Sequence, residues 1–147
     1  MKTYSVKPDE IKREWYTFDA SQIPLGRLST QVAKLLIGKD KAQFSKHIDC
    51  GDYVVITNSD KLILTGSKSD DKKYYRHSHY AGGLKETTLK QQLIKDSTEI
   101  IYHSIRGMLP VNKLRDQRLA RLKIYPSAEH NHAAQKPKTV SLKKEDK

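Results

Sequence analysis

The amino-acid sequence predicts a layered α/β domain, because strand-length apolar runs alternate along the chain with amphipathic helical segments. The run Tyr53–Thr57 is typical of a strand that is buried on both faces, as in a parallel sheet covered by helices. Residues 25–36 place their apolar side chains within about 100° of a helical wheel. Gly38 stands where the C-terminal glycine of that helix is expected. The 147 residues amount to one domain.

Local patterns predict the other elements of the first half. Residues 15–19 are aromatic and β-prone, which indicates the first strand. Residues 61–65 predict a short strand that ends at Gly66, and residues 67–73 are polar enough to form a loop. Residues 73–77 predict a further strand.

The second half predicts helices. Leucines four apart indicate a helix over 88–95, and isoleucines at spacings of three and four indicate another over 99–108. Asp96 and Ser97 are suitable cap residues between them. A third helix is expected to begin near Asn112, and arginines fall inside its apolar arc. Either that helix ends early, or one side of it touches a polar group.

The end of the chain differs in composition. Residues 123–125 predict a last short strand before Pro126. Residues 136–147 hold five lysines and two acids with few apolar groups, which predicts a basic, flexible tail. We therefore expect a single domain over residues 1–135 followed by a tail over 136–147.

The charge of the chain is strongly positive and unevenly distributed. Lys and Arg number 28 against 17 Asp and Glu, so the formal net charge is +11, and the sequence pI is near 9.7. Residues 106–125 hold six basic residues and one acid, and residues 25–47 hold five and one. This pattern predicts a basic face that binds nucleic acid, with an anionic membrane as the competing partner.

Signatures of other protein classes are absent from the sequence. Cys50 is the single cysteine, which excludes an intrachain disulfide and a cysteine-based zinc site. No apolar run is long enough for a signal peptide or a membrane helix. Gly38-Lys39 and Gly82-Gly83 lack the remaining residues of a phosphate loop or a dinucleotide fingerprint. We expect a soluble intracellular protein without a catalytic site or cofactor.

Two close histidine pairs leave a metal site as an alternative. His77 and His79, and likewise His130 and His132, are two residues apart, so in extended chain each pair lies on one face. A catalytic zinc site usually has a third protein ligand, which the sequence does not place beside either pair. The competing interpretation is that these histidines contact phosphates or stack on bases.

A run of basic and aromatic residues over 68–80 gives the stronger signal. Lysine and arginine bind phosphates, while flat rings stack on unpaired bases. The alternative is an edge strand whose lysines prevent aggregation. We interpret the run as a contact with RNA.

The chain resembles the bacterial large-subunit ribosomal protein L13 family over roughly residues 3–137. The resemblance rests on blocks that follow one another in order: Trp15–Ala20, Leu25–Leu28, His47–Val54, Asn58, Asp60-Lys61, Thr65-Gly66, Lys73–His77, Gly82–Lys85, Gly107–Pro110, Leu122–Tyr125 and His130–Pro137. There are two departures. Val111 stands where the family usually has lysine, and Leu114-Arg115-Asp116 stands where the family has Leu-Gly-Arg.

The resemblance implies a three-layer α/β/α single domain around a small, mainly parallel four-stranded sheet with basic loops. It implies a structural constituent of the large ribosomal subunit in the cytoplasm, which binds 23S rRNA early in subunit assembly. It implies neighbouring large-subunit proteins as partners, and no catalysis, cofactor, metal, membrane, small-molecule substrate or obligate homo-oligomer. Two alternatives are a free regulatory RNA-binding protein and a metal-dependent RNA-processing enzyme that uses the histidine pairs.

The candidate RNA-binding residues combine the resemblance with the distribution of charge. They come from the first predicted helix and the residues after it, from the central basic and aromatic run, and from the C-terminal third. They are Arg27, Lys34, Lys39, Lys41, Lys68, Lys72, Lys73, Tyr75, Arg76, His77, Lys85, Arg106, Lys113, Arg115, Arg118, Arg121, His130 and His132.

Overall fold

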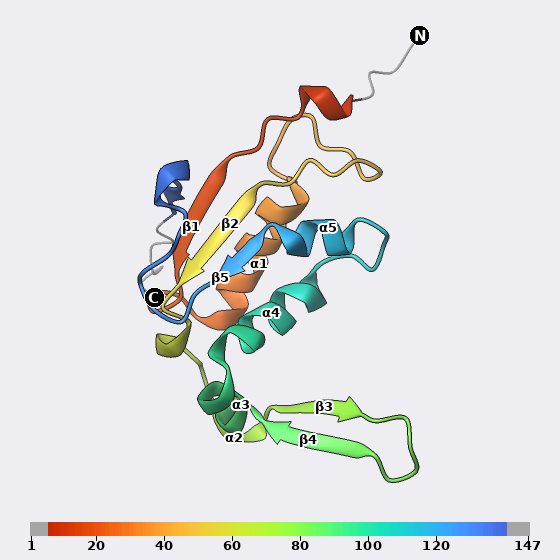
Figure 1. Ribbon diagram of the computed structural model, residues 1–147, viewed down its shortest axis with the longest axis vertical. Coiled ribbons are helices and arrows are strands. Elements are labelled where there is room, and N and C mark those ends of the chain that lie inside the picture. Colours follow the sequence, from red (N-terminus) through yellow and green to blue (C-terminus); the bar gives the residue numbers. More distant parts are fainter. Residues whose placement is uncertain (1–5, 141–147) are drawn as a thin grey trace.

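The main sheet has four parallel strands in the order β5-β2-β1-β6. A computed structural model describes residues 6–140 of the chain. In it β1 spans Trp15–Asp19, β2 Tyr53–Thr57, β5 Leu122–Ile124 and β6 Lys138–Thr139. Strand β1 lies between β2 and β6, and β5 pairs with the other side of β2 (Figure 1). The predicted α/β class with a small parallel sheet is confirmed.

Helices fill the connections between these strands. Helix α1, Leu25–Ile37, joins β1 to β2. Between β2 and β5 the chain forms α2 (Lys68–Asp71), α3 (Leu89–Lys95), α4 (Ser97–Met108) and α5 (Arg115–Ala120). Three short 3-10 helices complete the structure: η1 (Pro8–Glu10), η2 (Ser59–Lys61) and η3 (Ala133–Gln135). Helix α1 ends at Gly38, whose left-handed backbone conformation closes the helix as predicted.

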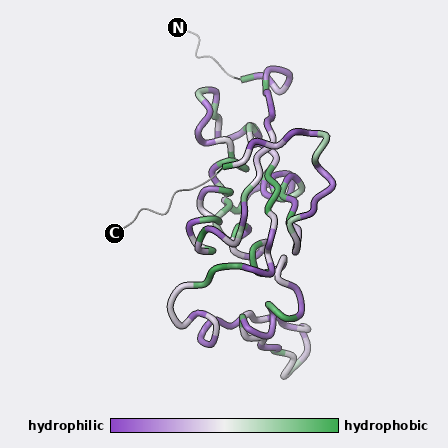
Figure 2. The backbone as a smooth tube through the Cα atoms, turned by 90° about the vertical axis from the view of Figure 1, so that its left-hand side faces the viewer, coloured by the Kyte–Doolittle hydropathy of each residue, from purple (hydrophilic) through white to green (hydrophobic). Residues whose placement is uncertain are grey.

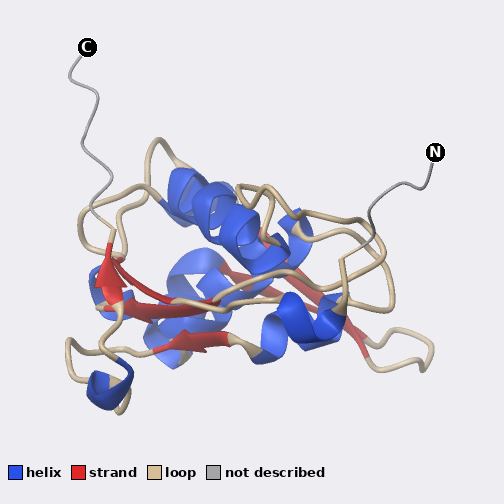
Figure 3. Cartoon of the chain, turned by 90° about the horizontal axis from the view of Figure 1, so that it is seen from above, coloured by secondary structure: helices blue, strands red, loops and turns tan. Residues whose placement is uncertain are grey.

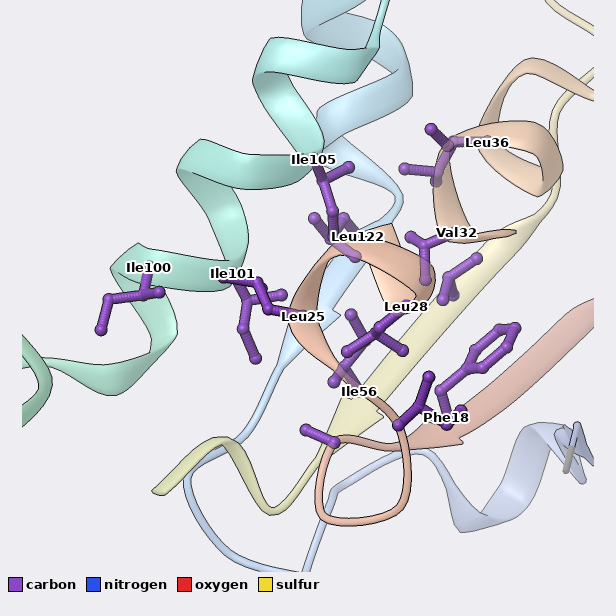
Figure 4. Packing of buried hydrophobic residues seen from close by; sticks show 14 of the residues in the cluster. Phe18, Leu25, Leu28, Val32, Leu36, Ile56, Ile100, Ile101, Ile105 and Leu122 are labelled. Atoms are coloured by element: carbon purple, nitrogen blue, oxygen red, sulfur yellow. The ribbon is translucent and has the colours of Figure 1, made fainter. Parts of the chain in front are cut away.

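The core lies between one face of the main sheet and helices α1 and α4 (Figure 4). Side chains alternate along a strand, so Phe18 of β1 and Ile56 of β2 point to this face. The helices contribute residues at spacings of three and four, which form one buried stripe on each. Hydrophobic segments accordingly run through the body of the molecule, and much of the outer chain is hydrophilic (Figure 2). The buried helical side chains include Leu28, Val32, Leu36, Ile101 and Ile105.

An aromatic cluster covers the opposite face of the sheet. Trp15 of β1 stacks on Tyr53 of β2 with ring centroids 4.4 Å apart, and His132 packs against Trp15 at 5.0 Å. The segment from β5 to β6, which includes η3, crosses this face before it reaches the far edge of the sheet. The layers are seen from above in Figure 3. The layer on this face is therefore thin, with one turn of 3-10 helix.

A separate antiparallel hairpin projects from one end of the molecule (Figure 1). It consists of β3, Lys73–His77, and β4, Leu84–Thr88, and it continues directly into α3. Thr88 and Gln91 form a capping box at the start of that helix, where each side chain bonds the backbone N–H of the other. The hairpin is therefore joined to a well-capped helix at its base.

The structure corrects several local predictions. Residues 61–65 form no strand beyond an isolated bridge between Ile63 and Pro24, and residues 67–73 contain the short helix α2. Asp96 is confirmed as an N-cap, since its carboxylate accepts from the N–H of Thr98. Strand β4 was not predicted.

Two residues of the segment predicted as a tail lie in the main sheet. Lys138 and Thr139 form strand β6 and pair with Tyr16 and Thr17, so the main sheet extends beyond residue 135. The Lys138 ammonium also donates to Glu14 at 2.8 Å. The rest of the predicted tail, residues 141–147, lies outside the described residues.

A buried ion cluster joins the ends of α1, α5 and the sheet. The carboxylate of Asp49 accepts two hydrogen bonds from the guanidinium of Arg121, and Arg118 Nε lies 3.6 Å from it. Arg13 approaches from the N-terminal segment, at 3.7 Å from the carboxylate. Arg118 and Arg121 are only 1% and 7% exposed, so these charges are removed from water. Losing the one anion would leave uncompensated buried cations.

We expect Asp49→Asn to lower the free energy of unfolding by about 3–5 kcal/mol, the range for removing one partner of a buried ion pair. Urea denaturation measures the change. Asp116→Asn is the matched control, because Asp116 is exposed on the neighbouring helix and its substitution should cost less than about 0.5 kcal/mol. Equal stability of the two variants would contradict the structural role of Asp49.

An added methyl group is expected to change the stability of the fold in opposite directions at two glycines, Gly51 and Gly26. A Cβ at Gly51 would overlap the backbone carbonyl of Leu36 and come within 2.8 Å of Arg121 Nη2, whereas a Cβ at Gly26 would meet nothing within 4 Å. We expect Gly51→Ala to destabilise the fold by several kcal/mol, roughly the range of the most severe point substitutions. Gly26→Ala should stabilise it by up to about 1 kcal/mol, since alanine favours helix α1. Thermal unfolding of both variants tests this opposition.

Candidate nucleic-acid interface

The hairpin gathers the central group of predicted residues. Strand register places Arg76 opposite Lys85, and His77 opposite Leu84. All four residues are exposed, as is Tyr75. The hairpin therefore presents cations to solvent on both of its strands and aromatic rings on β3.

Tyr74 holds the hairpin to the body of the molecule. Its ring packs against the hydrophobic core, lies 5.8 Å from the ring of His103 on α4, and has the ammonium of Lys72 at 5.3 Å. Burial raises the pKa of the Tyr74 hydroxyl, which is consistent with an apolar environment. The strands beyond Tyr74 therefore project from a fixed base.

Lys68 and Lys72 lie at that base. Together with Gly26 of α1, they line a shallow pocket of about 190 Å³. Arg27 is the next residue along α1 and is exposed. The first turn of α1, α2 and the start of β3 are thereby brought together at the hairpin end of the molecule.

Some predicted cations are paired with acids of the chain itself. The ammonium of Lys73 binds Glu86 across the hairpin at 3.0 Å, and this hydrogen bond raises the pKa of Lys73. Lys41 binds the buried carboxylate of Asp52 at 2.6 Å and also donates to a backbone carbonyl. The ammonium of Lys34 lies 3.9 Å from the carboxylate of Asp40, and both of these side chains are exposed to solvent. Lys41 is therefore a structural residue, because its carboxylate partner is buried.

Arg118 and Arg121 are corrections to the predicted interface. Both guanidinium groups are buried around Asp49 and face the interior, so they are not available to a phosphate on the surface. This burial also explains why arginine falls within the apolar arc of the α5 helical wheel. Arg118 lies on the inner side of that helix, where it faces the carboxylate of Asp49. A fold that buries these arginines uses them for its own stability.

The corner between α4 and α5 carries a second group of predicted residues. Arg106 and Lys113 are exposed, and the guanidinium of Arg115 donates to the backbone carbonyl of Arg106. Val111, the departure from the family's lysine, is exposed at the same corner.

His130 and His132 belong to the aromatic cluster on the other face of the sheet. Their rings stack at 6.4 Å, and His132 Nε2 lies 3.1 Å from the hydroxyl of Tyr125. Burial is the largest cause of the lowered pKa of His132, and the nearby charges of His130 and Lys123 lower this pKa further. These contacts place the pair apart from the hairpin and give it a packing role in the fold.

Most of the exposed candidates occupy segments that project toward one long side of the molecule. The loop after α1, the α4–α5 corner and the hairpin all extend to the right in Figure 1. The candidate residues did not include Lys46 and His47 in the first of these segments, although both are exposed, and exposed Tyr80 at the hairpin tip was part of the predicted run over 68–80 but not one of the candidates. The exposed candidates in these segments are Lys39, Lys73, Tyr75, Arg76, His77, Lys85, Arg106 and Lys113; Arg27 and Lys68 are also exposed, near the base of the hairpin.

The described part of the chain contains no group of three His, Cys, Asp or Glu side chains arranged to hold a metal ion. Within the same residues 6–140, no helix is long and apolar enough to cross a membrane. The histidine pairs contact neighbouring rings and backbone N–H groups.

Comparison with known proteins places the chain in a family. A model of the family described as "Ribosomal protein L13" matches residues 13–131. The "Large ribosomal subunit protein uL13" of Maridesulfovibrio salexigens is 51% identical over 97% of this chain and 100% of its own length. Proteins of the same name from Kocuria rhizophila and Thermotoga maritima are 50% and 49% identical, over 94% and 96% of this chain and 94% and 95% of their own lengths. The chain therefore belongs to the ribosomal protein L13 family.

Proposed function

We propose that this protein is a structural, non-catalytic constituent of the large ribosomal subunit in the cytoplasm, and that it binds 23S rRNA early in subunit assembly. Membership of the L13 family supports the place in the subunit. The observation that supports the contact with RNA is the projecting hairpin, where Arg76 and Lys85 lie side by side and exposed, in a chain with net charge +11.

Electrostatic attraction supplies the affinity in this proposal. Each phosphate that a lysine or arginine neutralises releases condensed counterions, and this release drives binding without reading sequence. Side chains cannot read the deep major groove of an A-form helix, so specificity comes from RNA shape and from unpaired bases. Segments that project from a rigid domain suit this mode, because they reach into an irregular RNA surface.

The body of the domain folds before it docks in this proposal. Its core and the Asp49 cluster use only contacts within the chain, so RNA is not required to complete them. Neighbouring large-subunit proteins complete the environment of the domain. A second copy of the chain is not needed.

Substituting Arg76→Gln and Lys85→Gln together should weaken binding to deproteinised 23S rRNA. It should also reduce the magnitude of the slope of log affinity against log salt by about 1.4–1.8, because two phosphate contacts are lost. The fold should be unaffected, since both side chains are exposed. Lys123→Gln with Lys136→Gln is the matched control, which removes two exposed charges outside the predicted set. Filter binding at several KCl concentrations measures affinity and slope; equal losses in both double variants would assign the effect to net charge alone.

Wild-type binding should be strongly dependent on salt. With about 6–10 phosphate contacts, affinity is expected to fall roughly 10³–10⁵-fold between 50 and 200 mM salt on the precedent of duplex DNA. An association constant that stays level across this range would rule out the electrostatic mechanism.

Sedimentation of cell extracts through sucrose gradients tests the place in the subunit, because a free regulatory RNA-binding protein would remain near the top of the gradient.

A further inference from the structure

The two faces of the β3–β4 hairpin carry different chemistry. Paired residues of neighbouring strands lie on the same face, and faces alternate along each strand. Arg76 and Lys85 therefore share one face with Tyr74, the residue that anchors the hairpin. The other face carries Tyr75 and Leu84, together with His77, Lys73 and Glu86.

The face with Tyr75 is aromatic and apolar, and its one lysine is paired. Lys73 binds Glu86 on the same face, so that cation is compensated. The ring of Tyr75 is 62% exposed and Leu84 is 55% exposed, and the two lie diagonally across the strands. His77 Nδ1 accepts a hydrogen bond from the backbone N–H of His79 at 2.9 Å. The face therefore offers a phenol ring, an aliphatic side chain and an imidazole.

We propose that this face receives an unpaired base of 23S rRNA, which stacks on the ring of Tyr75, while Arg76 and Lys85 on the opposite face bind the flanking phosphates. The inference rests on the proposed function and specifies the nucleotide chemistry of the same site. The exposed cations behind the ring favour a polyanion as the occupant. Proteins hold single-stranded nucleotides with aromatic rings on which the bases stack and with lysine or arginine side chains that bind the phosphate backbone.

The division of roles predicts different effects for ring and charge. Tyr75→Leu removes the ring and keeps an apolar side chain, so affinity for deproteinised 23S rRNA should fall about 5- to 150-fold, the range for one stacked base. The slope of log affinity against log salt should stay at its wild-type value. Tyr75→Phe keeps the π-face and should bind within about 3-fold of wild type if stacking follows the ring. Because Tyr75 is exposed, thermal unfolding of all three proteins should agree.

Ultraviolet crosslinking of intact large subunits locates the contact directly. Irradiation at 254 nm, followed by mass spectrometry of nucleotide-linked peptides, should yield a crosslink at Tyr75. The proposal is overturned if Tyr75→Leu binds as wild type or if the only crosslinks of this face lead to another protein. Those results leave rRNA binding by Arg76 and Lys85 intact. A wild-type protein that fails to bind 23S rRNA would instead refute the proposed function.

Discussion

The fold depends on one buried carboxylate. Asp49 interacts with guanidinium groups from two segments that are far apart in the sequence: Arg13 of the N-terminal segment, and Arg118 and Arg121 at the end of α5. Three cations around one anion need further acceptors, and backbone carbonyls provide them for Arg121 and Arg13, whereas Nε and Nη1 of Arg118 are buried without a hydrogen-bond partner among the described residues. The carbonyl of Leu36, at the negative end of α1, accepts from Arg121, and that of Gly51 accepts from Arg13. The cluster thus fixes the order of β1, β2 and β5 at one end of the sheet.

This constraint also separates structural cations from the exposed cations that we propose bind RNA. Arg118 and Arg121 point inward toward Asp49. The backbone carbonyl of Arg121 also accepts a hydrogen bond from the N–H of Val54 in β2. The hairpin lies at the other end of α1 and α4 and contributes no strand to the main sheet. Its exposed residues can therefore be adapted to a partner without disturbing the core. Net charge alone does not distinguish these two populations.

The sequence predicted the elements whose burial leaves a local pattern. Helix α1 has a complete apolar stripe and a closing glycine, and β2 is buried on both faces, so both were found with accurate ends. Strand β4, Leu84–Thr88, is mostly exposed and polar, and only its pairing with β3 defines it. The two residues of β6 depend in the same way on the edge of β1. Arg118 and Arg121 resemble surface arginines in sequence, because their partner Asp49 lies about 70 residues away in the chain.

The two interpretations of the basic run, edge protection and RNA contact, describe the same residues at different times. A two-stranded hairpin is marginally stable alone and exposes two unpaired edges, so an exposed Tyr75 and Leu84 would invite pairing with other chains. Charged neighbours oppose that pairing while the protein is free. In the proposed complex with RNA, phosphates would neutralise the same cations and the exposed ring would be covered. The charges on one face therefore allow an apolar surface on the other, and a register shift of one residue would exchange the two faces and destroy both properties.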